Sequence, residues 1–179
     1  ALLSGAPRRL TERFVGSNLA GVWSPDGRRF AYVSRRGPLP DAPGSIVVVI
    51  RSMDTGEERD LFSMLSFNRA RPVVRWFPDG RSLLLTVSDS RGRWLLYRMD
   101  AQTGAAARIG GGPGLGTPGF AFQPPVLSPN GRTVYYLRVN DPASGDSRVT
   151  QSVMKFDLAT GRQRELYRGW PHLLVPALS

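Results

Sequence analysis

The residues that catalysis or metal binding would need are few in this sequence. It contains one histidine, His172, in the segment Trp170-Pro171-His172, and it contains no cysteine. A serine nucleophile would need a turn such as Gly-x-Ser-x-Gly to present it, and that pattern is absent. A histidine-based zinc site would need further ligands. We therefore predict no catalytic residue, no metal ligand and no cofactor, and interpret His172 as a surface histidine.

Two other patterns could suggest ligand chemistry. Residues 110–119 are rich in glycine, but a phosphate-binding loop would also need Gly-Lys-Ser/Thr leading into a helix. The aspartates recur with the repeat described below, which indicates turns, because calcium needs several oxygens converging on one point. Asp141 and Asp146 are the remaining candidate for a cation site.

Binding to another protein is the chemistry that the sequence favours. Trp170 lies beside Arg168, and an exposed aromatic side chain next to an arginine is a common anchor at interfaces. Arg35 and Arg36 precede a segment that differs between the repeats, where binding residues are often found. We predict that these four residues contact a partner.

The charge of the chain has two interpretations. It carries 24 basic and 14 acidic residues, a formal net charge of +10, and Lys155 is its only lysine. The arginines either replace lysine at ordinary surface positions, as in proteins from GC-rich genomes, or form a surface for an acidic partner. They are dispersed and accompany no nucleic-acid-binding motif, which argues against nucleic acid as the partner. No apolar run is long enough to span a membrane.

These residues are positioned by a repeat. A first pattern, Trp-Ser-Pro-Asp-Gly-Arg in its first copy, recurs near residues 23–28, 76–81 and 127–132. Its predicted turn residues are Pro25, Asp26, Gly27, Pro78, Asp79, Gly80, Pro129, Asn130 and Gly131. A second pattern follows each copy: Asp54-Thr55-Gly56, then Asp100 with Thr103-Gly104, then Asp157 with Thr160-Gly161. Proline, aspartate and glycine together favour tight chain reversals.

The stretches between these turns are β-branched, aromatic or apolar, as in strands. Four strands in a repeat of about 50 residues predict an all-β fold, a β-propeller of four-stranded blades. A β-sandwich and a β-helix fit the fixed repeat less well. The predicted blades cover about residues 19–62, 72–109 and 124–168, with the last strand of a preceding blade at 1–18 and the start of a following blade at 169–179. About three blades of a ring of six to eight are thus expected. A longer chain, a second copy that makes a homodimer, or another subunit could complete the ring.

The Ser-Pro-Asp-Gly-Arg turn after a Trp-bearing strand resembles the repeats of TolB-like propellers, and is similar to those of prolyl oligopeptidase-type and dipeptidyl peptidase-type propellers. Phe77 and Asn130 depart mildly from that pattern. The resemblance implies a bacterial envelope (periplasmic) location and a protein partner. We expect a non-catalytic binding or assembly module, or an accessory subunit of a complex. The alternatives are the gating propeller of a serine peptidase and a small-molecule sensor.

Overall fold

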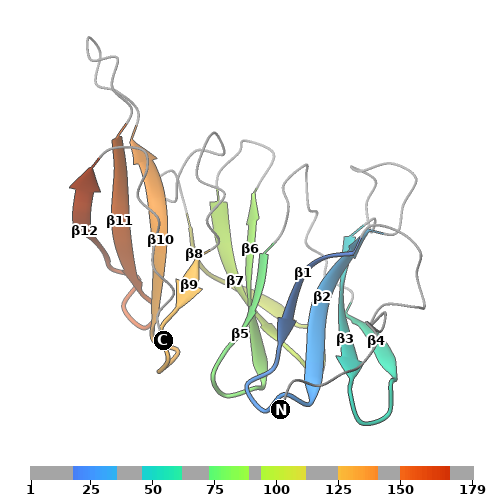
Figure 1. Cartoon of the computed structure of the whole chain (residues 1–179). Helices are drawn as coiled ribbons and strands as arrows, with labels where there is room; N and C mark the ends of the chain where they lie inside the picture. Colours follow the sequence, from blue (N-terminus) through green and yellow to red (C-terminus); the bar gives the residue numbers. More distant parts are fainter. Residues whose placement is uncertain are drawn as a thin grey trace, which may run out of the picture.

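The strands form three four-stranded sheets, each built from consecutive strands (Figure 1). This computed structural model describes residues 18–35, 46–61, 73–88, 94–111, 125–140 and 150–169. Blade 1 contains β1 (Asn18–Trp23), β2 (Arg29–Arg35), β3 (Ile46–Ser52) and β4 (Glu58–Leu61). Blade 2 contains β5 (Val73–Trp76), β6 (Ser82–Ser88), β7 (Trp94–Asp100) and β8 (Ala106–Gly111). Blade 3 contains β9 (Val126–Leu127), β10 (Thr133–Asn140), β11 (Thr150–Asp157) and β12 (Gln163–Gly169).

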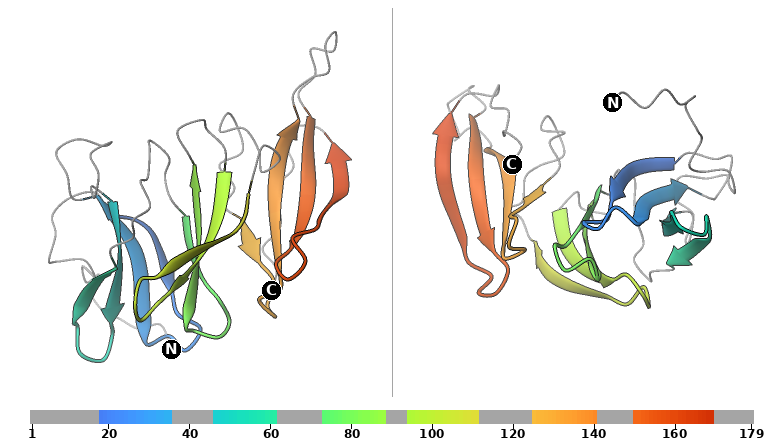
Figure 2. Two further views of the ribbon diagram at one scale, coloured as in Figure 1. Left: turned by 180° about the vertical axis from the view of Figure 1, so that it is seen from behind. Right: turned by 60° about the horizontal axis from the view of Figure 1, so that its bottom comes forward.

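All neighbouring strands within a blade are antiparallel. The three sheets stand side by side in chain order and fan out, as the views of Figures 1 and 2 agree. No helix in the described part of the chain is long and apolar enough to cross a membrane. The predicted strands within 1–18 and 169–179 fall almost wholly outside the described residues, as do the segments that differ between repeats.

The first reversal of each blade follows its first strand and is held by backbone and side-chain bonds. In blade 1 the Gly27 amide donates to the carbonyl of Ser24 at 2.9 Å, and the backbone N–H two residues after Asp26 donates to the Asp26 carboxylate at 3.0 Å. Gly27 has a φ of 69°, and the equivalent Gly80 and Gly131 have values of 62° and 68°. Glycine adopts this left-handed conformation without the steric cost that a Cβ atom imposes. The reversal therefore has the same backbone geometry in all three blades.

The second reversal joins the third and fourth strands. In blade 2 the Asp100 carboxylate accepts hydrogen bonds from the Gln102 and Thr103 amides at 2.8 and 2.7 Å. Asp157 does the same in blade 3. In blade 1 the equivalent residue is Ser52, whose hydroxyl accepts from the Thr55 amide at 3.2 Å. The sequence-based alignment of Asp54 with these two aspartates is therefore wrong, because Ser52 occupies the position that accepts the turn's hydrogen bonds.

Both kinds of reversal lie at one edge of the blades, at the bottom of Figure 1, which we call the turn edge. The sequences that join the second strand to the third, and one blade to the next, connect strand ends at the opposite edge. Residues 36–45 join β2 to β3, and residues 62–72 join blade 1 to blade 2. The two reversals that the sequence repeat predicts therefore lie on the same side of every blade.

The apolar faces of neighbouring blades share two cores. The first core spans blades 1 and 2: Ala31, Val33, Val48, Ile50, Leu61, Val74, Trp76, Leu83, Leu85, Val87, Met99 and Ala101. The second core spans blades 2 and 3: Phe77, Leu84, Leu96, Val134, Tyr136, Met154 and Phe156. Since successive side chains of a strand point to opposite faces, Leu84 and Leu85 of β6 enter different cores. Blade 2 is therefore buried on both faces.

Candidate interaction surfaces

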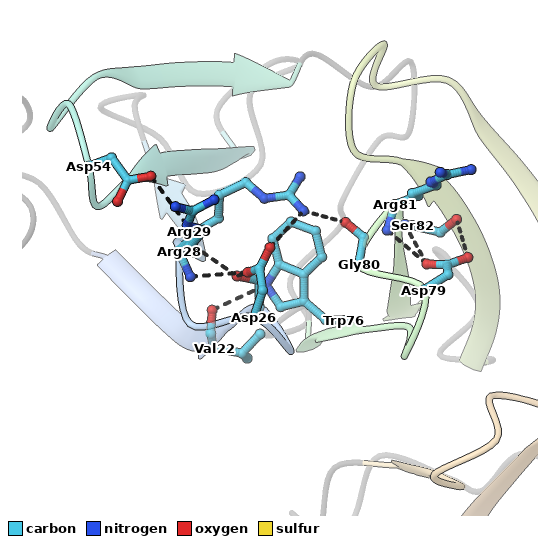
Figure 3. A network of polar contacts seen from close by, with 11 residues as sticks. Val22, Asp26, Arg28, Arg29, Asp54, Trp76, Asp79, Gly80, Arg81 and Ser82 are labelled. Carbon is cyan, nitrogen blue, oxygen red and sulfur yellow. Dashed lines mark hydrogen bonds and ion pairs between the residues drawn. The ribbon is translucent and has the colours of Figure 1, made fainter.

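Trp76 of β5 is the centre of the packing between blades 1 and 2, which we call joint 1–2. Its indole Nε1 donates to the carbonyl of Val22 in β1 at 3.3 Å, and the Arg29 guanidinium carbon lies 4.8 Å from its ring centroid (Figure 3). Trp76 is only 7% exposed, and it packs with Val33 and Ile50 of blade 1. Apolar packing, a hydrogen bond and a cation–π contact therefore converge on one side chain.

Two arginines of blade 1 reach across the same joint. Arg29 Nη2 donates to the carbonyl of Gly80 at 2.6 Å. Arg59 donates to the carbonyls of Gln102 and Ala101 at 2.7 and 2.6 Å. A guanidinium presents several donors in a fixed plane, so it can satisfy turn carbonyls on the neighbouring blade. Joint 1–2 therefore combines a buried tryptophan with two arginines that donate hydrogen bonds to backbone carbonyls of the neighbouring blade. We call these two arginines the latches.

The packing between blades 2 and 3, joint 2–3, is built differently. Ser82 and Ala107 occupy the positions that Arg29 and Arg59 hold in blade 1, so neither arginine latch is repeated. Leu127 occupies the tryptophan position of β9. These replacements leave joint 2–3 without the polar latches of joint 1–2.

Phe77 takes over the central role in joint 2–3. It is 3% exposed, packs in the second core, and lies 4.5 Å from the guanidinium of Arg98. Pro78 approaches Gly131 of blade 3 so closely that a Cβ atom there would lie 2.9 Å from its ring. The replacement of serine by Phe77 is thus a packing feature of joint 2–3.

On the faces of blades 1 and 3 that point away from blade 2, two large side chains are exposed, although Tyr32, Val47 and Val49 on that face of blade 1 are buried. On blade 3, Tyr167 of β12 is 54% exposed, although Leu61 at the equivalent register position of β4 is 3% exposed. On blade 1, Trp23 is 51% exposed, although it occupies the position of Trp76. Trp23 packs edge-on against Phe30 at 5.1 Å between ring centroids. We call these the outer face of blade 3 and the outer face of blade 1.

A hollow of about 380 Å³ opens at the turn edge between blades 1 and 2. Asp26, Arg29 and Asp100 are among its lining residues. The Ser24 hydroxyl and then the following backbone lower the pKa of Asp26, and hydrogen bonds from the Thr103 amide and hydroxyl lower the pKa of Asp100. These charged groups already have partners within the turns, so the hollow is a by-product of turn construction. Within the described ranges, no group of three or more His, Asp or Glu residues could hold a metal ion.

The turn edge carries a repeated arginine. Arg28, Arg81 and Arg132 follow the glycine of the first reversal in blades 1, 2 and 3, and all three are exposed. Arg28 forms an ion pair with Asp54 at 3.6 Å, in which both side chains are well exposed to solvent. Because the neighbouring turn carboxylates accept hydrogen bonds from their own turns, the repeat leaves a row of cations along this edge.

The predicted partner-binding residues are not brought together in the described structure. Arg168 is exposed on β12, and its guanidinium donates to the Glu165 carboxylate at 3.2 and 3.1 Å. This contact is the main reason that the pKa of Glu165 is lowered. Arg35 is partly buried at the end of β2. Trp170 and Arg36 lie outside the described residues, so their predicted role stays a prediction.

Sequence reasoning missed Trp23 and Tyr167 as surface features. The repeat aligns Trp23 with Trp76, which is buried, and it gives no indication that Trp23 or Tyr167 is exposed. The repeat pattern contains no signal for this exposure, because Trp76 and Leu61 at the equivalent positions are buried.

Solved structures with the same fold include proteins of several functions. A TolB protein from Agrobacterium tumefaciens is 23% identical, with a TM-score of 0.60, over 93% of this chain and 54% of its own. A dipeptidyl aminopeptidase IV-type protein from Bacteroides ovatus is 15% identical, with a TM-score of 0.62, over 89% of this chain and 30% of its own. The β-propeller domain of the Trilobed protease from Pyrococcus furiosus is 12% identical, with a TM-score of 0.59, over 84% of this chain and 43% of its own.

These similarities confirm the predicted β-propeller fold and the likeness to TolB and peptidase propellers. The chain spans about half the length of the TolB structure and less than half of the other two. No protein-family model matches the chain, and no curated protein sequence matches it. At these sequence identities the similarities establish the fold alone. The function must therefore be argued from the surface of the protein.

Proposed function

We propose that this propeller is a non-catalytic module that binds another protein in the bacterial envelope, as a subunit of a larger assembly there. The observation that carries the proposal is the row of exposed arginines at the turn edge: Arg28, Arg81 and Arg132. Three cations at one repeat position form a regular surface that suits an acidic protein partner. The likeness to the TolB structure supports the location and the protein-binding role.

The turn edge suits binding because its framework is rigid by construction. Each arginine follows a glycine in a turn whose backbone is held by hydrogen bonds, as between Gly131 and Ser128 at 2.8 Å. The carboxylates closest to the arginines accept bonds from their own turns, as Asp79 does from the amides of Arg81 and Ser82. A partner would therefore meet positioned cations with little further ordering of the backbone.

A peptidase accessory role is the second candidate function. It is favoured by the likeness to the dipeptidyl aminopeptidase IV-type structure and to the Trilobed protease propeller. In that case the partner surface would face a catalytic domain. Both candidates give the described blades a binding role without chemistry of their own.

The test is a quantitative binding measurement with the partner that crosslinking identifies in the host's envelope fraction. We expect the double variant Arg81→Gln, Arg132→Gln to weaken this binding by about tenfold or more at low salt. The matched variant Arg108→Gln, Arg164→Gln removes the same charge from exposed positions of the fourth strands and should bind nearly as the wild type does. If the two double variants bind equally well, the turn edge is not the partner site. If no partner binds saturably, the proposed function is wrong.

A further inference from the structure

We propose that Arg75 of β5 binds the carboxylate group of a small organic acid at the inner edge of joint 2–3. The first strands of the three blades are β1, β5 and β9, and within their described residues Arg75 is the only charged one. The proposal does not rest on the proposed function, which uses the turn edge.

The position of Arg75 in the repeat is otherwise apolar. Val22 holds it in blade 1 and Val126 holds it in blade 3, each directly before the residue that aligns with Trp76. Val22 packs against the first core, so valine suits the fold at this position. A first strand therefore forms without a charge here, and the construction of the strand does not explain the arginine.

The strand geometry places Arg75 on the face of blade 2 that meets blade 3. Its sequence neighbours Val74 and Trp76 enter the first core, and successive side chains of a strand point to opposite faces. Its register partner in β6 is Leu84, which belongs to the second core. The right-hand view of Figure 2 shows β1, β5 and β9 on the inner side of the fan, with β4, β8 and β12 on its outer side. Arg75 therefore lies at the inner edge of joint 2–3.

The guanidinium of Arg75 has unused donors. It is partly buried, and its described hydrogen bond runs from Nη1 to the carbonyl of Val74 at 3.1 Å. No carboxylate of the described residues forms an ion pair with it, whereas the partly buried Arg51 pairs with Glu58 at 3.3 Å. None of its nitrogens is both buried and without a partner, so the remaining donors reach solvent. A ligand can therefore approach them.

Partial burial makes a counter-ion favourable at this position. Loss of hydration lowers the pKa of Arg75, which means that its surroundings disfavour the charged form. The group still keeps its charge at neutral pH, because the pKa of an arginine lies far above that range. A bound anion offsets the lost hydration, and the planar guanidinium can donate parallel hydrogen bonds to both oxygens of a carboxylate.

The surroundings of Arg75 indicate the class of anion. The first strand of blade 3 consists of Val126 and Leu127, and Leu127 packs against the core that contains Phe77. A single cation neutralises one negative charge, which suits a monocarboxylate better than a doubly charged phosphate. The apolar residues of the neighbouring strand suit the hydrocarbon part of an organic acid. The ligand class is therefore a small organic monocarboxylate.

The first test is titration calorimetry of the whole chain with propionate, benzoate and inorganic phosphate at constant ionic strength. We expect saturable binding of the two carboxylates and weaker binding of phosphate. Arg75→Val should weaken carboxylate binding by about tenfold or more, and Arg75→Lys, which keeps the charge without the planar fork, should weaken it less. Arg81→Val removes the same group from the turn edge and should bind as the wild type does. Absence of saturable carboxylate binding, tighter binding of phosphate, or equal binding by Arg75→Val would overturn the proposal.

The stability of Arg75→Val separates a ligand site from a structural residue. This variant carries the residue that blades 1 and 3 have at the same position, and it removes a partly buried charge that has no ion-pair partner among the described residues. We therefore expect its urea midpoint in a carboxylate-free buffer to equal or exceed that of the wild type. Added benzoate should raise the midpoint of the wild type and leave that of the variant unchanged. A variant midpoint clearly below that of the wild type would show that Arg75 maintains the fold, and the proposal would then be wrong.

Discussion

The guanidinium carbon of Arg29 lies over the ring of Trp76, 4.8 Å from its centroid, and the same guanidinium donates to the carbonyl of Gly80. One side chain of blade 1 thus contacts both a core residue and a turn of blade 2. Arg28, its neighbour in sequence, is instead exposed, and its guanidinium forms an ion pair with Asp54 at 3.6 Å. The two adjacent arginines therefore have different consequences for stability.

We expect Arg29→Ala to lower the free energy of unfolding by about 1–3 kcal/mol, because it removes a hydrogen bond and a cation–π contact. Arg29→Lys should recover less than half of that loss, since an ammonium lacks the planar fork. Arg28→Ala should stay within about 0.5 kcal/mol of the wild type. Urea denaturation at one fixed protein concentration measures all three. If Arg29→Ala and Arg28→Ala lowered the free energy of unfolding equally, the proposed role of Arg29 in joining blades 1 and 2 would be wrong.

The two repeat-equivalent tryptophans should differ in the same way. Trp76→Ala removes a buried side chain and should cost about 3–5 kcal/mol of unfolding free energy. Trp23→Ala removes a half-exposed side chain whose described ring contact is with Phe30, and should cost about 1 kcal/mol in dilute solution. The measurement is again urea denaturation, monitored by far-ultraviolet circular dichroism so that loss of a fluorophore does not matter. If the two variants lost similar unfolding free energies, Trp23 would have to be buried in the isolated chain.

Gly27 and Gly131 offer a matched pair at the first reversal. Both have φ near +68°, so replacement of either by alanine should cost about 1–2 kcal/mol. At Gly131 the new Cβ atom would also lie 2.9 Å from the Pro78 ring, whereas at Gly27 nothing lies within 4 Å. We therefore expect Gly131→Ala to be the more destabilising by about 1–3 kcal/mol, because joint 2–3 must shift. Equal thermal unfolding midpoints for the two variants would show that the joint is looser than described.

Acid should weaken the second reversals of blades 2 and 3. Hydrogen bonds from Thr103 lower the pKa of Asp100, and those from Thr160 lower the pKa of Asp157. Their ordinary value in an unfolded chain is about 3.9. Since the folded values lie below it, the stabilisation is complete above that pH and is lost as the pH falls through the folded values.

The double variant Asp100→Asn, Asp157→Asn keeps an acceptor oxygen at each turn and removes the charge. We expect it to have a lower thermal midpoint than the wild type at pH 7 and a flatter midpoint curve between about pH 5 and pH 2. Calorimetry at constant ionic strength measures both curves. Parallel curves for the two proteins would exclude these carboxylates as a source of acid sensitivity.

The fold was predictable from local sequence because the turns are local. Gly27, Gly80 and Gly131 mark reversals whose hydrogen bonds all fall within a few residues, so the repeat period alone identified the blades. The alignment failed at Ser52, where a hydroxyl replaces a carboxylate in the same role. The sequence pattern therefore predicted the turns, but it did not predict which polar side chain accepts the hydrogen bonds in each turn.

The joints were less predictable because they depend on residues about 50 positions apart. Trp23 and Trp76 precede equivalent turns, and yet Trp23 is 51% exposed and Trp76 is 7% exposed. Phe77 departs mildly from the repeat in sequence and yet sits at the centre of joint 2–3. The arginine latches likewise require the spatial neighbour, which one sequence without related sequences does not reveal.

Blade 2 shares one core with blade 1 and another with blade 3, and this arrangement has a consequence for how the described blades unfold. The blades behave as a line of coupled units in which each unit is stabilised only by its immediate neighbours. Melting an outer unit breaks one coupling, whereas melting the middle unit breaks both. Among the three described blades, the middle sheet should therefore be the last to lose protection from hydrogen exchange.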